Sequence, residues 1–187
     1  EEQREQTKKR NKLLYQSEHD ELTGLYNKRS LNRYLEDVFE ACKLNEKELG
    51  ILFLDIDYFK QLNDRYGHGK GDEGICAVAD TLKRIFPEDY VARYGGDEFL
   101  VVMPERDLTY AMEHAESLCA GIRECKIPNE DSEVESWLTI SVGGVCAIPK
   151  EPNRVWDFLS AADNTLYEQK KEQKGKVRFY QGEGKYL

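Results

Sequence analysis

The sequence predicts an α/β fold in which helices flank a mixed central sheet. Amphipathic helical patterns alternate with short apolar runs typical of strands, which is the order expected when helices cover a sheet. Residues 91–103 have the pattern of two strands joined by a glycine turn, so at least one pair of strands is antiparallel. The chain has 187 residues, 40% of them hydrophobic, which is enough for one globular domain with a substantial core.

Helices are predicted where apolar residues recur every three or four positions behind a polar residue. Asn27 and Asp107 are each placed to accept a hydrogen bond at a helix start, and Pro87 is placed to end a helix. A glycine-rich loop over residues 67–71 is expected to lead into the second helix. The predicted helices cover residues 28–43, residues 72–86, a stretch that follows Asp107, and residues 155–173.

Strands are predicted from short apolar runs. Residues 50–57 are apolar until they end in two aspartates, which is typical of a central strand covered on both faces. Residues 91–94 and 99–103 are expected to form a hairpin around two glycines, which allow positive φ in a tight turn. The remaining expected elements are an acidic surface loop over 128–136, a strand over 137–147 with a bend or bulge at Gly143–Gly144, and a short edge strand over 177–180.

The net charge of −9 argues against a surface that binds a nucleic-acid polymer, because such a surface is basic. It does not exclude a single nucleotide bound through metal ions. The sequence shows no signal peptide and no apolar run of membrane length, which favours a cytoplasmic domain without direct membrane contact. The cysteine spacing indicates neither a disulfide framework nor zinc, and four cysteines are expected to be small core residues: Cys42, Cys76, Cys119 and Cys146.

The first seventeen residues differ from the rest of the chain. They are rich in charge, contain neither glycine nor proline, and are expected to form an exposed helix. The alternative is a frayed, solvated terminus. We therefore expect residues 1–17 to be a linker helix, the end of a longer stalk, and residues 18–187 to be one domain.

Acidic residues follow two predicted strands. Asp55 ends the central strand, and Asp97 and Glu98 follow the glycine pair of the hairpin. Carboxylates at the ends of neighbouring strands suit Mg²⁺, a hard ion that takes one or two carboxylates together with substrate phosphate oxygens. The alternatives are a solvated strand end for Asp55 and an ordinary acidic turn for the other two.

An ordered series of motifs resembles one protein family. Gly95-Gly96-Asp97-Glu98-Phe99 resembles the signature of the GGDEF domain, the diguanylate cyclase family. The similarity covers roughly residues 18–181, which makes it far more specific than a single motif. The other matching segments are residues 20–25, 53–64, 67–72, 139–143 and 162–167.

The resemblance implies a core like that of nucleotidyl cyclase and polymerase palm domains. It implies an enzyme that condenses two GTP into cyclic di-GMP with release of two pyrophosphates. Mg²⁺, for which Mn²⁺ may substitute, would be held by Asp55, the carbonyl of Ile56, Asp97 and Glu98. Asp97 or Glu98 would help remove the hydroxyl proton, with a metal-bound hydroxide or water as alternatives.

The resemblance also assigns the substrate contacts. Phosphates would be bound by Lys60, which is also a catalytic candidate, by the backbone amides of Tyr58 and Phe59, and by two basic residues, Lys170 and Lys174. Guanine would be recognised by Asn63 and Asp72, with His68 in the same region. Several alternatives stay open: Asp72 as a helix cap, His68 as a structural residue, Asp57 as a rim carboxylate held by local hydrogen bonds, and Gly175 as the glycine that ends the last helix.

Partners and regulation also follow from the resemblance. Catalysis would require a homodimer, coupled through residues 1–17 to an upstream sensory module. The output domain of a membrane-anchored sensor is one alternative for the cytoplasmic location. Many members carry an inhibitory Arg-x-x-Asp pair ahead of the signature, where this chain has Phe86 and Asp89, so we expect weak or absent product inhibition there. The competing interpretations are a catalytically silent regulatory module that responds to GTP or cyclic di-GMP, and a purely structural dimerisation domain.

Overall fold

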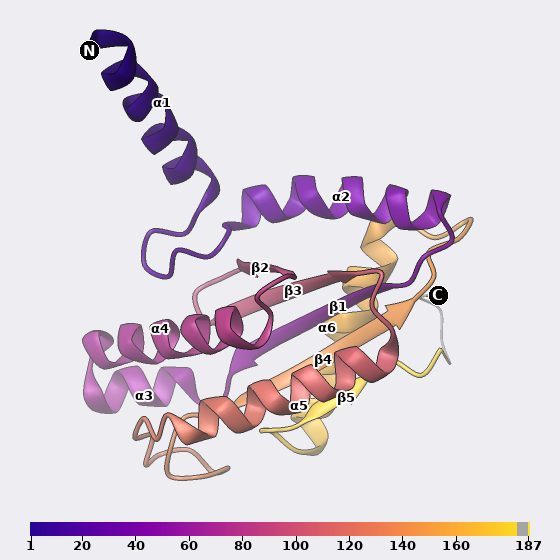
Figure 1. Cartoon of the computed structure of the whole chain (residues 1–187). Helices are drawn as coiled ribbons and strands as arrows, with labels where there is room; N and C mark the ends of the chain where they lie inside the picture. The colour runs from indigo at the N-terminus through magenta and orange to yellow at the C-terminus, as the bar shows by residue number, and fades with distance from the viewer. Residues whose placement is uncertain (183–186) are drawn as a thin grey trace.

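A computed structural model of the chain describes residues 1–182 and 187 (Figure 1). Two layers of helices enclose a five-stranded sheet, and the N-terminal helix projects away from these layers. The predicted mixed sheet flanked by helices is therefore confirmed. The elements are α1 (Glu2–Glu18), α2 (Lys28–Leu44), β1 (Leu49–Ile56), α3 (Phe59–Tyr66), α4 (His68–Ile85), β2 (Tyr90–Arg93), β3 (Glu98–Pro104), α5 (Leu108–Glu124), β4 (Ile140–Ala147), α6 (Val155–Glu172) and β5 (Val177–Phe179).

The sheet has the strand order β2-β3-β1-β4-β5, so β1 lies in the middle and β5 at an edge. β1 is antiparallel to both of its neighbours, β2 and β3 form the predicted hairpin, and β5 is parallel to β4. All eight residues of β1 are buried. This confirms the prediction of a central strand covered on both faces.

Alternation along β1 decides which helices each residue meets. Leu52, Leu54 and Ile56 belong to a core shared with α3, α4 and α5. Ile51 and Phe53 belong to a second core shared with α2 and α6. Asp55 continues this second series, so its carboxylate points to the side of the sheet that α6 covers.

Both predicted helix caps are present. The Asn27 side chain accepts a hydrogen bond from the Ser30 amide at 2.9 Å, and Asp107 accepts one from the Tyr110 amide at 2.8 Å. Each replaces one of the backbone contacts that a helix start leaves unmade.

The predicted glycine-rich loop over residues 67–71 is wrong. Only Gly67, with φ of 86°, interrupts the chain there, and α4 begins at His68 rather than near residue 72. The helix before it, α3, was not predicted. A Cβ at Gly71 would lie 1.8 Å from Oδ1 of Asn63 in α3, so this glycine lets the two helices pack closely rather than loosening the backbone.

The predicted bend or bulge at Gly143–Gly144 is also wrong, because both residues pair in unbroken register with β1. A Cβ at Gly143 would lie 2.2 Å from the backbone nitrogen of Leu166 in α6, and one at Gly144 would lie 2.5 Å from the Phe179 ring. These glycines bring α6 and β5 close to the sheet. The strand itself begins at Ile140, three residues later than predicted.

The cysteine prediction holds for two of its four residues. Cys42 and Cys119 are buried, as expected of core positions, whereas Cys76 and Cys146 are half-buried. The sulfur of Cys76, in α4, contacts the Leu22 carbonyl, and that of Cys146, in β4, contacts the Arg106 carbonyl.

The N-terminal segment forms the expected exposed helix, since α1 has no buried residue and stands clear of the sheet (Figure 1). A column of stacked rings joins its end to the domain, with centroids 3.9–4.6 Å apart. The rings follow one another in the order Tyr15, His19, Tyr26, Tyr90 and Tyr34.

No helix in the described part of the chain is long and apolar enough to cross a membrane.

The close approach at Gly143 predicts a large loss of stability on substitution. Gly143→Ala should lower the free energy of unfolding by about 3 kcal/mol, because the new methyl group meets backbone atoms of α6 that cannot move aside. Urea denaturation followed by circular dichroism measures this. Gly69→Ala is the control: no atom lies within 4 Å of its Cβ position, so stability should stay equal or rise. Equal stability of the two variants would contradict the packing argument.

Candidate functional site

The register of the sheet brings the predicted metal ligands to one place. Asp55 at the end of β1 lies directly opposite Glu98 at the start of β3. The amide of Ile56 donates a hydrogen bond to the Asp97 carbonyl at 3.2 Å. The two predicted strand ends therefore meet. The carboxylates of Asp55, Asp97 and Glu98 lie together where β1 ends and β3 begins, and we call this cluster the carboxylate edge.

Asp55 is the most constrained of these carboxylates, since only 9% of the residue is exposed. Its Oδ2 accepts a hydrogen bond from Lys170 Nζ at 2.5 Å, and its Oδ1 is buried without a hydrogen-bond partner among the described residues. Burial raises the pKa of Asp55 to about 6, even though the Lys170 ammonium acts to lower it. Although burial opposes it, the hydrogen bond to Asp55 raises the pKa of Lys170. One oxygen of Asp55 is thus ready to receive a cation.

The two glycines of the hairpin make room for Glu98. A Cβ on Gly95 would lie 2.6 Å from Oε2 of Glu98, so a larger residue would displace that carboxylate. Neither Gly95 nor Gly96 has positive φ, which corrects the predicted reason for the pair. Burial raises the pKa of Glu98, and the nearby charges of Asp97 and Asp163 add to the effect.

Arg93 fixes the hairpin turn from the side. Its guanidinium donates hydrogen bonds to the carbonyls of Gly95 at 3.1 Å and Gly96 at 2.7 Å, and it forms an ion pair with Asp20 at 3.2 Å. Asp20 also accepts hydrogen bonds from the backbone and hydroxyl of Thr23, at 2.9 and 2.7 Å. Sequence reasoning did not assign a role to Arg93, although all three of its partners lie in segments that carried the family resemblance.

The turn that follows β1 leads directly into α3. Asp57 accepts hydrogen bonds from the hydroxyls of Thr139 at 2.8 Å and Ser141 at 2.6 Å, as the alternative for this residue expected, but it is buried rather than at the rim. Tyr58 follows in the left-handed region, with φ of 53°, and no side chain caps α3. The amides of Tyr58 and Phe59 therefore stand at a helix start, where backbone N–H groups and the helix dipole favour an anion.

Two lysines line a groove beside this turn. Lys170 and Lys174 border a cavity of about 290 Å³ together with Tyr58 and Glu133, and Lys174 Nζ lies 4.3 Å from the centre of the Tyr58 ring. Because Gln173 caps α6 in an extended conformation, Gly175, with φ of 78°, lies two residues beyond the cap. The alternative that Gly175 ends α6 is therefore wrong, and both lysines stay beside the turn.

The predicted guanine contacts lie on the packed pair α3 and α4. The half-buried Asn63 presents a buried Oδ1 that has no hydrogen-bond partner in the described chain. Asp72 is exposed one turn inside α4, whose cap is Gly67, so the alternative that Asp72 caps the helix is wrong. His68 is exposed at the first residue of α4, and Lys60 is exposed on α3.

The carboxylate edge fits a divalent cation shared with a substrate rather than a closed protein cage. Within the described residues, no three histidine, cysteine, aspartate or glutamate side chains group closely enough to bind a metal by themselves. Mg²⁺ typically uses one or two carboxylates and completes its shell with water and phosphate oxygens. The unpartnered buried oxygen of Asp55, beside Asp97 and Glu98, meets that requirement.

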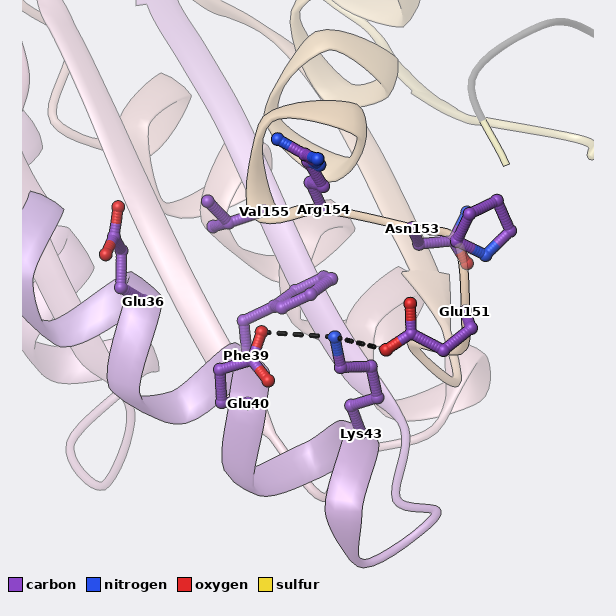
Figure 2. Close-up of a pocket in the computed structure, with 9 residues that line it drawn as sticks. Glu36, Phe39, Glu40, Lys43, Glu151, Asn153, Arg154 and Val155 are labelled. Atoms are coloured by element: carbon purple, nitrogen blue, oxygen red, sulfur yellow. Dashed lines mark ion pairs between the residues drawn. The ribbon is translucent and has the colours of Figure 1, made fainter.

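A second groove, of about 430 Å³, lies between α2 and the segment before α6 (Figure 2). Lys43 lies between Glu40 and Glu151, at 3.2 and 3.1 Å. The groove shares no residue with the carboxylate edge, and its lysine is already paired with two carboxylates, so we do not assign the chemistry to it.

Comparison with known proteins identifies the family of the chain. The family model described as diguanylate cyclase, GGDEF domain, matches residues 17–176. The probable diguanylate cyclase DgcC of Escherichia coli is 33% identical over 161 residues, 86% of this chain and 42% of that protein. The diguanylate cyclase VdcA of Vibrio cholerae is 35% identical over 153 residues, 81% of this chain and 43% of that protein. The chain thus spans less than half the length of these relatives.

Solved structures support the fold. The coiled coil and GGDEF domain of DgcB from Caulobacter crescentus, solved in complex with c-di-GMP, matches with a TM-score of 0.86 at 24% identity. The match covers 95% of this chain and 93% of that one.

The Asp20–Arg93 pair predicts a pH-dependent loss of stability. Although burial opposes it, hydrogen bonds from Thr23 and the charge of Arg93 lower the pKa of Asp20 below its usual 3.8. Asp20 therefore stabilises the fold above that pH and ceases to do so as the pH falls through its folded pKa. Asp20→Asn should lower the free energy of unfolding by about 1 kcal/mol at pH 7.

Urea denaturation from pH 7 down to pH 3 measures this loss, which should shrink as the wild-type carboxylate takes up a proton. The matched control is Asp37→Asn, which changes an exposed residue of α2 and should leave stability unchanged at every pH. A difference between wild type and Asp20→Asn that stays constant down to pH 3 would contradict the role of the charge.

Proposed function

This chain belongs to the GGDEF domain family of diguanylate cyclases, and from that membership we propose that it condenses two GTP molecules into cyclic di-GMP. In each of two steps, a 3′-hydroxyl attacks the α-phosphate of the other nucleotide, and pyrophosphate leaves. The observation that carries the proposal is the buried, unpartnered oxygen of Asp55 opposite Glu98, at the end of the central strand.

Asp55, Asp97, Glu98 and the Ile56 carbonyl are the groups that would hold Mg²⁺ or Mn²⁺. When bound, such an ion neutralises phosphate charge and orients the attacking and leaving oxygens. Asp97 or Glu98 would also help remove the proton of the 3′-hydroxyl, with a metal-bound hydroxide or water as alternatives.

Phosphate binding is assigned to the turn that follows β1 and to the C-terminal end of α6. The amides of Tyr58 and Phe59 hold phosphate oxygens at the start of α3, with Lys60 beside them. Lys174 adds charge from the groove, and Lys170 exchanges its contact with Asp55 for a contact with phosphate when the nucleotide enters. Such an exchange keeps the Lys170 charge compensated in both states.

Guanine recognition is assigned to the α3–α4 pair. The exposed carboxylate of Asp72 accepts hydrogen bonds from N1–H and the exocyclic amine of guanine, the Asn63 carboxamide serves the same edge of the base, and His68 borders the same region. Adenine lacks that pair of donors. When ATP binds, each buried acceptor left without a partner costs about 1–3 kcal/mol, which is enough to favour GTP over ATP.

Two active sites are needed for one product, because each site binds one GTP and the product joins two. We therefore propose a homodimer in which two domains, each comprising residues 18–187, face each other. The linker helix, residues 1–17, would couple the pair to an upstream sensory module, with the domain as a cytoplasmic output unit. These proposals rest on the family and on the exposed position of α1.

Incubation with GTP and Mg²⁺, followed by chromatography, should yield cyclic di-GMP and pyrophosphate, and removal of the metal should abolish the product. Asp97→Asn should lower the rate at least about a hundredfold, because it removes a carboxylate at the reacting centre. Glu151→Gln, in the groove of Figure 2, is the control and should leave the rate unchanged. GTP binding without product would instead support the silent regulatory module, and absence of both would support a structural domain.

Product inhibition through Asp89 should be weak or absent. Phe86 occupies the position of the family's arginine and is buried, and the Asp89 carboxylate is held by the Tyr110 hydroxyl at 2.5 Å and by Arg106 at 3.5 Å. A carboxylate with 2% side-chain exposure is not available to a ligand. Titration of the cyclase with cyclic di-GMP measures this; strong noncompetitive inhibition that Asp89→Ala removes would contradict it.

A further inference from the structure

One buried polar side chain outside the proposed site reaches the turn that binds phosphate. Asn129 belongs to the loop between α5 and β4, residues 128–136, and is 0% exposed. Its Nδ2 donates hydrogen bonds to the carbonyls of Asp57 and Tyr58, at 3.4 Å each. These are the two residues between β1 and α3, seventy-two and seventy-one positions away in the sequence.

The side chain of Asn129 does nothing for its own loop. The loop is closed by the backbone of Asn129, whose amide donates to the Ser136 carbonyl at 2.8 Å and whose carbonyl accepts from the Ser132 amide at 3.0 Å. Any residue except proline would make these two bonds. The carboxamide therefore has one set of partners, the two carbonyls of the turn.

The orientation of the carboxamide follows from these partners, since only the nitrogen can donate to two carbonyls. Its Oδ1 is left buried without a hydrogen-bond partner among the described residues. A buried acceptor without a partner is unfavourable, and an apolar side chain of equal size would avoid that cost. Asn129 is thus a poor choice for packing alone and a suitable one for holding the turn.

The turn needs such a contact because Tyr58 has φ of 53°, in a region that residues other than glycine rarely adopt. The same loop also holds the far end of α3, where Arg65 pairs with Glu130 at 2.5 Å and Asp131 at 2.9 Å. Those ion pairs are exposed, so Asn129 is the buried contact between the loop and the turn.

We propose that Asn129 is a positioning residue for substrate binding: its carboxamide fixes the Asp57–Tyr58 turn, so that the first amides of α3 point at the nucleotide phosphates. This inference rests on the proposed function, and it adds a residue from a loop that the chemistry does not otherwise use. The side chain acts on the ligand only through the turn.

The test is Asn129→Leu in the full chain, a change of nearly equal volume that removes both donors and the unpartnered acceptor. The unfolding midpoint should stay equal or rise. The dissociation constant for a GTP analogue that cannot be cleaved, and the KM for GTP, should each rise about tenfold, the factor expected when hydrogen bonds that orient the binding amides are lost. The kcat should change much less than KM.

Two further variants separate this role from a general structural one. Asn129→Ala should show the same rise in KM together with lower stability, because it also leaves a cavity. Glu130→Gln, which removes an exposed ion pair of the same loop, is the matched control and should leave KM unchanged. An Asn129→Leu protein that binds GTP as wild type does would overturn the inference while leaving the proposed function intact.

A readout without nucleotide tests the inference even if the wild type binds no GTP, an outcome that would defeat the proposed function itself. Two bonded amides report on the turn, that of Asp57, which donates to the Thr139 carbonyl at 3.0 Å, and that of Leu62, which donates to the Tyr58 carbonyl at 3.1 Å. Their hydrogen exchange should be faster in Asn129→Leu than in wild type, whereas exchange in β3 should be unchanged. Equal exchange of these two amides in the two proteins would overturn the positioning role.

Discussion

The structure depends on a carboxylate that ends a strand buried on both faces. Asp55 lies where β1 leaves the core, and its charge cannot be fully hydrated there. Lys170 of α6 compensates part of that charge and leaves one oxygen without a partner. The helix that covers this side of the sheet is thereby tied to the strand end. A cation or a proton is the natural complement of the remaining oxygen, so the same constraint that orders the sheet creates the place where a nucleotide can be activated.

Glycines determine how near the surrounding elements come to that place. At Gly143 the backbone of α6 meets β4 so closely that no side chain fits between them, and this contact positions the helix that carries Lys170. At Gly71 the helix α4 meets Asn63 of α3 in the same way, and at Gly95 the space is filled by Glu98. In all three cases a glycine is needed because a Cβ atom would occupy space that the neighbouring atoms already fill. None of these glycines has positive φ, so what they provide is proximity rather than an unusual backbone conformation.

The helices and strands with clear periodicity could be predicted from the sequence, as could the hairpin, both caps and the two acidic strand ends. The helix α3 could not, because it has eight residues, buries only Leu62, and follows a left-handed Tyr58 that offers no capping side chain. The purpose of the glycines was misjudged because a sequence does not tell whether such a residue supplies φ or space. The contact of Asn129 with Asp57 and Tyr58 joins segments far apart in the chain, and its surroundings look like an ordinary acidic loop.

The column of rings from Tyr15 to Tyr34 has a mechanical consequence for α1. Its members belong to α1, its C-cap, the turn that follows, β2 and α2, and each stacked pair contributes about 0.5–1.5 kcal/mol. Rotation of α1 about its own axis would break these ring-stacking contacts one after another. The stacked rings therefore join α1 to the domain as a rigid connection rather than a flexible one. Torque applied at the far end of α1 would reach Tyr90 of β2, five residues before Gly95 of the hairpin turn.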